Sequence, residues 1–204
     1  PALVNWFPDW TTGTASGSGQ AGWVIDGSGD YVVVGGEFPF VNGQWSQGIA
    51  RFARPGTAAA TLGPILKGAD WVPSVASVSN GTARVTIPAN YDREDIDLTY
   101  RITRNGQQVY SGTTRAFYWY QPAVTFLDTG LTPGNTYTYQ VTAVDSDGNQ
   151  AQSSSVSVTA SGTAQSAYFN RVLADGATPY WQLGTSGDST YAYDVLGISN
   201  GLKG

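Results

Sequence analysis

Apolar and polar residues alternate most regularly in the segment TYTYQVTAV, residues 136–144. Every second residue from Tyr137 to Ala143 is apolar, and the residues between them are Thr and Gln. A period of two, carried by aromatic and β-branched side chains, predicts a half-buried strand rather than a helix. Pro133-Gly134 precedes this segment and Asp147-Gly148-Asn149 follows it, and both are turn sequences.

Six further segments around this strand have the same kind of pattern, and short turn sequences separate them. Asn80-Gly81 and Asn105-Gly106 are strong signals for such turns, because Asn and Gly tolerate the positive φ that a tight hairpin needs. Seven short strands at this spacing predict an antiparallel sandwich over residues 72–162. The six further strands are expected at residues 73–78, 83–87, 98–102, 109–110, 124–126 and 156–158.

A second group of predicted strands precedes the sandwich. Residues 23–25, 31–34 and 49–52 are apolar or β-rich segments, separated by turns at residues 26–30 and 41–43. Residues 55–71 contain Pro and Gly without any alternation, so they are expected to be a connector. No window has a sustained apolar repeat of 3.6 residues, so the chain is predicted to be all-β with almost no helix.

The spacing Leu-x-Pro-Gly-x-x-Tyr places Leu131, Gly134 and Tyr137 just before and within the central strand. This is the pattern of a tyrosine corner, in which the hydroxyl group bonds back to the backbone. On this motif and the strand count, residues 72–162 resemble a fibronectin type III domain, an immunoglobulin-like sandwich. That family usually has a Trp on its second strand, where this chain has Ile87, so Tyr139 or Phe126 is expected to fill the core instead.

The two flanks resemble parts of other all-β modules. Residues 22–52, with VVVGG, VNG and IARF in order, resemble one repeat of a bacterial β-propeller, so residues 1–54 are expected to form a blade-like unit. A solitary blade would leave four apolar side chains partly uncovered: Tyr31, Val33, Phe38 and Phe52. The unit would therefore be the last blade of a longer propeller, would pack on the next domain, or would be completed by another chain. Nearer the C-terminus, VLADG at residues 172–176, PYWQLG at residues 179–184 and Tyr193-Asp194 follow in order. On these motifs, residues 167–204 resemble the start of a LamG-like, concanavalin-type jelly roll, in a module that begins at residue 163.

Composition removes several classes of function. The chain has 10 Lys and Arg against 15 Asp and Glu, a net charge of −5, and the basic residues form no cluster. Neither nucleic acid nor an anionic membrane surface is therefore expected as a partner. Insertion into a membrane is not expected either, because no stretch of roughly 18 apolar residues could span a bilayer. The absence of Cys and His removes disulfides, thiolate ligands and the usual general base. No catalytic residue, metal ligand or cofactor is expected.

Two acidic segments are candidates for chemistry, and both have simpler interpretations. Asp145, Asp147 and Asn149 have the one-three-five spacing of a calcium loop but lack the later Glu, so a hairpin turn is favoured over a metal site. The stretch of Asp92, Glu94, Asp95 and Asp97 around Arg93 could serve acid–base chemistry. Without a known cleft, a solvated loop is favoured.

Runs of aromatic residues are the strongest candidates for contact with a ligand or partner. Phe117, Tyr118, Trp119 and Tyr120 are consecutive, and four such side chains cannot all face one core. They would seal a junction between domains, dock another protein, or stack on a sugar ring, in that order of preference. The clustered Trp6, Trp10 and Trp23 have similar alternatives, and a place in the core of the blade is favoured for them.

The patterns favour a non-enzymatic structural and adhesive segment of a secreted or cell-surface bacterial multidomain protein. The sandwich would be a spacer and protein-contact module, and its partners would be neighbouring domains, neighbouring chains or a glycan. Two alternatives stay open: an accessory region of a large polysaccharide-acting enzyme, and a subunit of a surface filament or phage assembly. The missing parts of the flanking modules predict a longer polypeptide.

Overall fold

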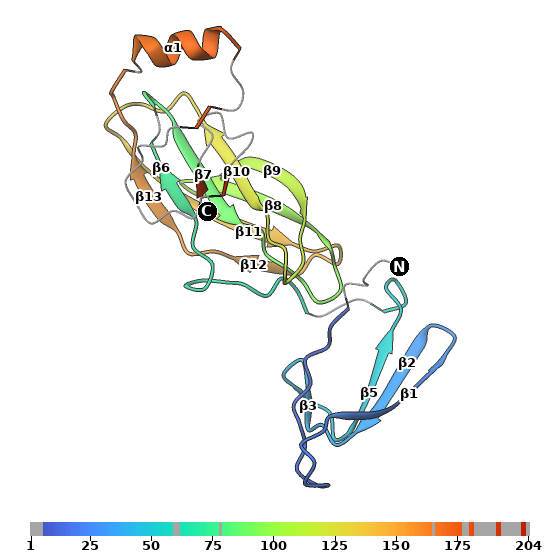
Figure 1. Cartoon of the computed structure of the whole chain (residues 1–204). Helices are drawn as coiled ribbons and strands as arrows, with labels where there is room; N and C mark the ends of the chain where they lie inside the picture. Colours follow the sequence, from blue (N-terminus) through green and yellow to red (C-terminus); the bar gives the residue numbers. More distant parts are fainter. Residues whose placement is uncertain are drawn as a thin grey trace. The chain divides into compact units, whose positions relative to one another are not determined.

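A computed structural model describes residues 6–58, 62–77, 79–164, 166–176, 180–181, 191–192 and 201–202. The prediction of an all-β chain is confirmed, since strands dominate and the described residues contain one short helix. The chain forms two compact units: residues 1–63 with 93–95, and residues 64–92 with 96–204. Figure 1 shows the strands of each unit.

The N-terminal unit is a small antiparallel sheet with a separate hairpin. Strands β1, β2 and β5 form the sheet in that order, and β3 pairs with β4. The β3–β4 turn is made by Asn42 and Gly43, whose φ values of 51° and 75° are those of a tight hairpin turn. The strands are β1 (Gly22–Ser28), β2 (Tyr31–Gly36), β3 (Phe40–Val41), β4 (Gln44–Trp45) and β5 (Ile49–Ala53).

One face of this sheet has its own small core, formed by Val34, Phe38 and Val41. The ring of Trp10 packs edge-on against Phe38 at 4.6 Å and also contacts Phe52. The expectation that Phe38 would be partly uncovered is therefore wrong, because Phe38 is fully buried under Trp10. Tyr31 and Val33, by contrast, are 39 % and 40 % exposed, as expected for the opposite face.

The larger unit contains the predicted seven-stranded sandwich. One sheet has the order β10-β7-β6; the other has β9-β8-β11, and β11 pairs along its length with β13 and then β12. All neighbouring strands are antiparallel, as expected for an immunoglobulin-like sandwich. The strands are β6 (Ser74–Ala76), β7 (Ala83–Pro88), β8 (Asp97–Arg104), β9 (Gln107–Arg115), β10 (Ala123–Asp128), β11 (Thr136–Val144), β12 (Gln150–Gln152) and β13 (Val156–Thr159).

The last strand is divided at Ser153, which the sequence pattern did not predict. The Ser153 hydroxyl accepts a hydrogen bond from the Val141 amide at 2.9 Å and donates one to the Ser154 carbonyl. A side chain thus satisfies a backbone group where the strand pairing changes from β12 to β13. The seven predicted strands correspond to β6–β11 and β13, and β12 is an additional segment that the sequence did not predict.

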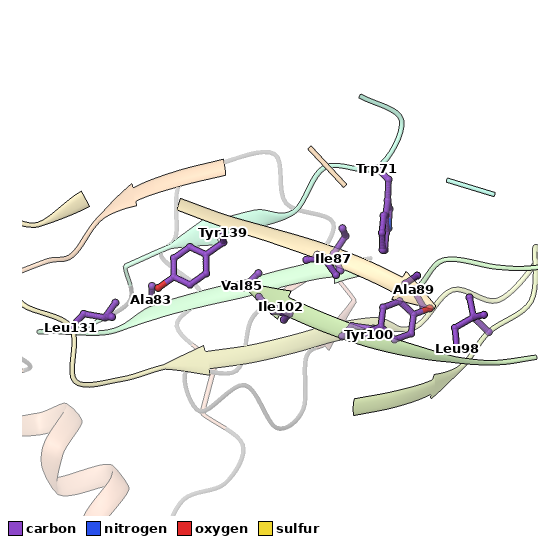
Figure 2. Close-up of a cluster of buried hydrophobic side chains, with 14 of the residues drawn as sticks. Trp71, Ala83, Val85, Ile87, Ala89, Leu98, Tyr100, Ile102, Leu131 and Tyr139 are labelled. Carbon is purple, nitrogen blue, oxygen red and sulfur yellow. The ribbon is translucent and has the colours of Figure 1, made fainter. Parts of the chain in front are cut away.

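The sandwich core is built from buried residues of both sheets together with Trp71, and Figure 2 shows Trp71 beside core residues of β7, β8 and β11. Ile87 and Tyr139 are fully buried, and Phe126 packs at the edge of the core. Trp71 is 2 % exposed, lies near Tyr100 and donates a hydrogen bond from Nε1 to the Pro88 carbonyl at 2.9 Å. A tryptophan outside the second strand therefore fills the space next to Ile87, and it comes from the segment expected to be a connector.

The C-terminal part begins with helix α1 (Ala167–Ala174). Ser166 caps it, since the Ser166 hydroxyl accepts from the Phe169 amide, and Phe169 packs edge-on against Tyr180. The short strands β14 (Tyr191–Ala192) and β15 (Gly201–Leu202) pair with each other. Most of the segment that resembles a LamG-like module, from residue 177 onward, lies outside the described residues.

Candidate aromatic contact site

The four consecutive aromatic residues form a tight hairpin between β9 and β10. Phe117 and Tyr120 exchange two backbone hydrogen bonds, of 2.8 Å and 3.0 Å. Gln121 adds a third, because its side-chain amide donates to the Tyr118 carbonyl. The sequence pattern predicted that these rings could not all face the core, and this bridged loop is the local structure that turns them outward.

Ring stacking holds the hairpin side chains in a fixed arrangement. The rings of Phe117 and Trp119 stack at 4.8 Å with an interplanar angle of 8°, and Tyr118 packs edge-on against Trp119. Tyr118, Trp119 and Tyr120 are 54 %, 48 % and 57 % exposed. The result is a rigid aromatic surface, which we call the aromatic hairpin (residues 117–120), suited to burial against another molecule or to stacking.

The tyrosine-corner residues lie at the end of the sandwich: Leu131 is buried in the core, Tyr137 is half-buried, and Gly134 is exposed in the loop before β11. Leu131 is 5 % exposed and part of the core, and Gly134 has a φ of 83° that disfavours other residues. The Tyr137 hydroxyl accepts a hydrogen bond from the Thr132 amide at 3.0 Å. This bond lowers the pKa of Tyr137, because the N–H group stabilises the phenolate. The corner is a structural feature of the loop before β11.

A buried polar network crosses the sandwich next to this corner. Arg104 donates from one guanidinium nitrogen to both oxygens of Asp128, at 2.9 Å and 3.0 Å. The Tyr139 hydroxyl donates to Asp128 at 2.7 Å. Burial, and next the bond to the Asp128 carboxylate, raise the pKa of Tyr139 far above its usual range. Sequence reasoning missed the network, because its members are far apart in the chain and show no motif.

The segment with calcium-like spacing is a turn held by its own side chains. Both oxygens of Asp145 accept hydrogen bonds from Asn149, one from its amide and one from its side chain. Asp145 is 7 % exposed, and one of its oxygens lies within 4.8 Å of an Asp92 oxygen. The two hydrogen bonds from Asn149 give both Asp145 oxygens a structural role in the turn.

The acidic stretch before β8 is not a uniformly solvated loop. Asp92 is fully buried in the sandwich, which corrects the expectation of a solvated loop at this residue. Asp97, at the start of β8, makes two hydrogen bonds with Arg115 of β9, and these bonds lower the pKa of Asp97. Cross-strand pairing with Arg115 therefore gives Asp97 a structural role.

The aromatic candidates of the N-terminal unit divide between core and surface. Trp10 is half-buried against Phe38, whereas Trp6 is 41 % exposed and packs edge-on against Phe52. The expectation that Trp23 lies in the core of the blade is wrong, because Trp23 is 58 % exposed. Sequence reasoning did not single out Trp45, which is 64 % exposed and, with Trp23, lines an open hollow of about 610 Å³. Its position in a two-residue strand gave no signal of exposure.

In the described part of the chain, no helix has the length and hydrophobicity needed to cross a bilayer. Comparison with known proteins adds little to the geometry. No protein-family model matches the sequence, and no curated protein matches it.

Solved structures resemble the chain only loosely. The sixth fibronectin type III domain of human fibronectin type III domain containing protein 3 is 24 % identical, covers 55 % of this chain and 99 % of that chain, and has a TM-score of 0.40. The FN5 domain of Drosophila Lar is 14 % identical, over 48 % and 100 % of the two chains, with a TM-score of 0.29. The Clostridium perfringens spore cortex lytic enzyme SleM is 15 % identical, over 59 % and 41 %, with a TM-score of 0.38. No function is carried over from them.

Proposed function

We propose that this chain is a non-catalytic structural and protein-contact segment of an extracellular or cell-surface multidomain protein. In this proposal the sandwich is a spacer, and the aromatic hairpin is its point of contact with another domain or a neighbouring chain. The observation that carries the proposal is the combination of order and exposure at residues 117–120. Tyr118, Trp119 and Tyr120 are about half exposed. Trp119 stacks on Phe117, Tyr118 packs edge-on against Trp119, and two backbone bonds join Tyr120 to Phe117.

Such an arrangement favours binding for two physical reasons. Tyr and Trp bury a large apolar area and still present a polar group, which is why they are enriched in contact surfaces. The stack and the bridged loop also fix the side chains before binding, so less conformational entropy is lost on contact. An exposed aromatic cluster without a partner would keep this apolar area in water.

The spacer role rests on the closed core and the corner. The core residues of both sheets are almost fully buried, and the loop before β11 is fixed by the Tyr137 hydroxyl. The two bonds between Asp128 and Arg104 tie β8 to the end of β10 in the facing sheet. A sandwich held at several points in this way resists deformation when its ends are pulled.

Site-specific photo-crosslinking tests the contact. A photoreactive benzoylphenylalanine replaces Trp119 in the full polypeptide in its native setting, and crosslinked peptides are identified by mass spectrometry. We expect crosslinks to one defined segment of another domain or neighbouring protein, whereas the same group at the exposed Gln108 of β9 gives few. Equal yields at the two positions would contradict the proposal, and crosslinks to glycan alone would favour a sugar-stacking role.

A further inference from the structure

The sheet of the N-terminal unit has a second face whose apolar side chains are left in solvent. Alternation along β2 and β5 sends Val34 and Phe52 into the small core and sends Val33 the other way. On that outward face, Val24 is 63 %, Val33 is 40 % and Ile49 is 69 % exposed. We call this surface the outer face of the N-terminal sheet.

The charges on the outer face are placed in one row across the three strands. Asp26 of β1 lies opposite Val33 of β2, and Val33 lies opposite Arg51 of β5. Strand β2 lies between β1 and β5 in the sheet (Figure 1). The pairing register therefore puts a carboxylate on one edge strand, a guanidinium on the other and a valine between them. Arg51 also lies over the Tyr31 ring at 4.8 Å, which keeps its charged group on this face.

This row is complementary to itself. When two such sheets stack face to face about a two-fold axis parallel to the strands, β1 of each copy lies over β5 of the other. Asp26 of each copy then meets Arg51 of its partner, and the two Val33 side chains meet at the axis. A two-fold contact repeats every interaction, so one row supplies two ion pairs that flank an apolar centre.

We propose that the outer face is an interface between two copies of this chain, paired through Asp26 and Arg51 around Val33. A polyanion or an anionic membrane needs several basic groups, whereas this row carries one charge of each sign. A wholly apolar partner would leave both charges without compensation. The surface belongs to the N-terminal unit alone, so its behaviour is separable from the contact proposed for the aromatic hairpin.

Charge reversal tests the pairing directly. The whole chain is examined by sedimentation velocity at concentrations from about 10 μM to 1 mM, a range that detects weak association. The unaltered chain is expected to form dimers that weaken with added salt. Asp26→Arg and Arg51→Asp should each raise the dissociation constant roughly tenfold, because both ion pairs become repulsive contacts. The double reversal should restore dimerisation, since the pairs form again with opposite sense.

Two controls separate this surface from other causes of association. Asp70→Arg makes the same change in net charge as Asp26→Arg, but at an exposed residue of the larger unit. It should leave dimerisation unchanged. Trp119→Ala should also leave it unchanged, because it alters only the aromatic hairpin. A monomeric chain at 1 mM, or dimers that ignore the single reversals or are not restored by the double one, would overturn the proposal.

Discussion

At the scale of single residues, the sandwich depends on polar groups placed where no local motif announces them. Tyr139 is inside the core, yet its hydroxyl reaches Asp128, whose carboxylate also accepts from Arg104. Tyr100 is likewise fully buried, and its hydroxyl donates to the Asn90 carbonyl at 3.1 Å. The hydroxyl groups of Tyr139 and Tyr100 both have a hydrogen-bond partner. The two side chains therefore bury their apolar area without the cost of an unsatisfied polar group.

The two buried phenols predict a loss of stability in alkaline solution. Burial raises the pKa of both Tyr100 and Tyr139 above the value of about 10 expected in the unfolded chain. Above that pH the unfolded state loses the two protons and the folded state keeps them. The stabilisation is therefore complete below about pH 10 and declines above it, by about 1.4 kcal/mol per pH unit for each phenol.

Urea unfolding between pH 9 and 12 checks this prediction. Tyr139→Phe should lower the free energy of unfolding at neutral pH, because Asp128 loses a hydrogen-bond donor. Above pH 10 the free energy of unfolding should also fall less steeply with pH, by about 1.4 kcal/mol per pH unit, because one of the two buried phenols is gone. Tyr118→Phe removes a phenol that is 54 % exposed and should leave the slope as it is. An identical slope in Tyr139→Phe and the unaltered chain would mean that the buried phenol ionises as easily folded as unfolded.

At the scale of elements, the residues before β6 belong to the sandwich. Asn90 makes two hydrogen bonds with the backbone of Leu66, one from its side-chain amide and one to its side-chain oxygen. The Gly68 amide donates to the Gln152 carbonyl. These bonds fix residues 64–71 along the sheet edges, and Trp71 then fills the core between Tyr100 and Pro88.

Replacement of Trp71 is therefore expected to cost as much as a change in a strand. Trp71→Ala should lower the free energy of unfolding by about 3–5 kcal/mol, because it leaves a large cavity and an unpaired Pro88 carbonyl. Trp71→Phe should cost less, since part of the ring volume is kept. Val72→Ala is the matched control, because Val72 is 50 % exposed and next in sequence. Chemical denaturation measures all three; equal losses for Trp71→Ala and Val72→Ala would show that the segment is only a connector.

The contrast between Trp71 and the strands shows what the sequence could predict. Period-two alternation and Asn-Gly turns are local, so the strands and the Asn105-Gly106 hairpin were evident from the sequence. The burial of Trp71 and Asp92 depends on contacts between distant segments, which no local pattern encodes. The aromatic hairpin lies between these cases: four consecutive rings predicted exposure, but the stack of Phe117 on Trp119 required the structure.

At the scale of the whole molecule, the chain combines two units with different surfaces. The larger unit has a closed core and one exposed aromatic hairpin. The smaller unit has a core of a few residues and an apolar outer face. Small domains bury a low fraction of their surface, so a unit of this size gains most from being covered by other protein. Contact with neighbouring protein is thus the function that both units favour.

Hydroxyl-radical footprinting of the aromatic hairpin tests that central claim most directly. Oxidation of Tyr118, Trp119 and Tyr120 is measured by mass spectrometry in the isolated chain and in the protein in its native setting. The account predicts rapid oxidation in the isolated chain, where these rings are about half exposed, and strong protection in the native setting. Equal oxidation rates in both would show that nothing covers the hairpin and would contradict its role as a protein contact.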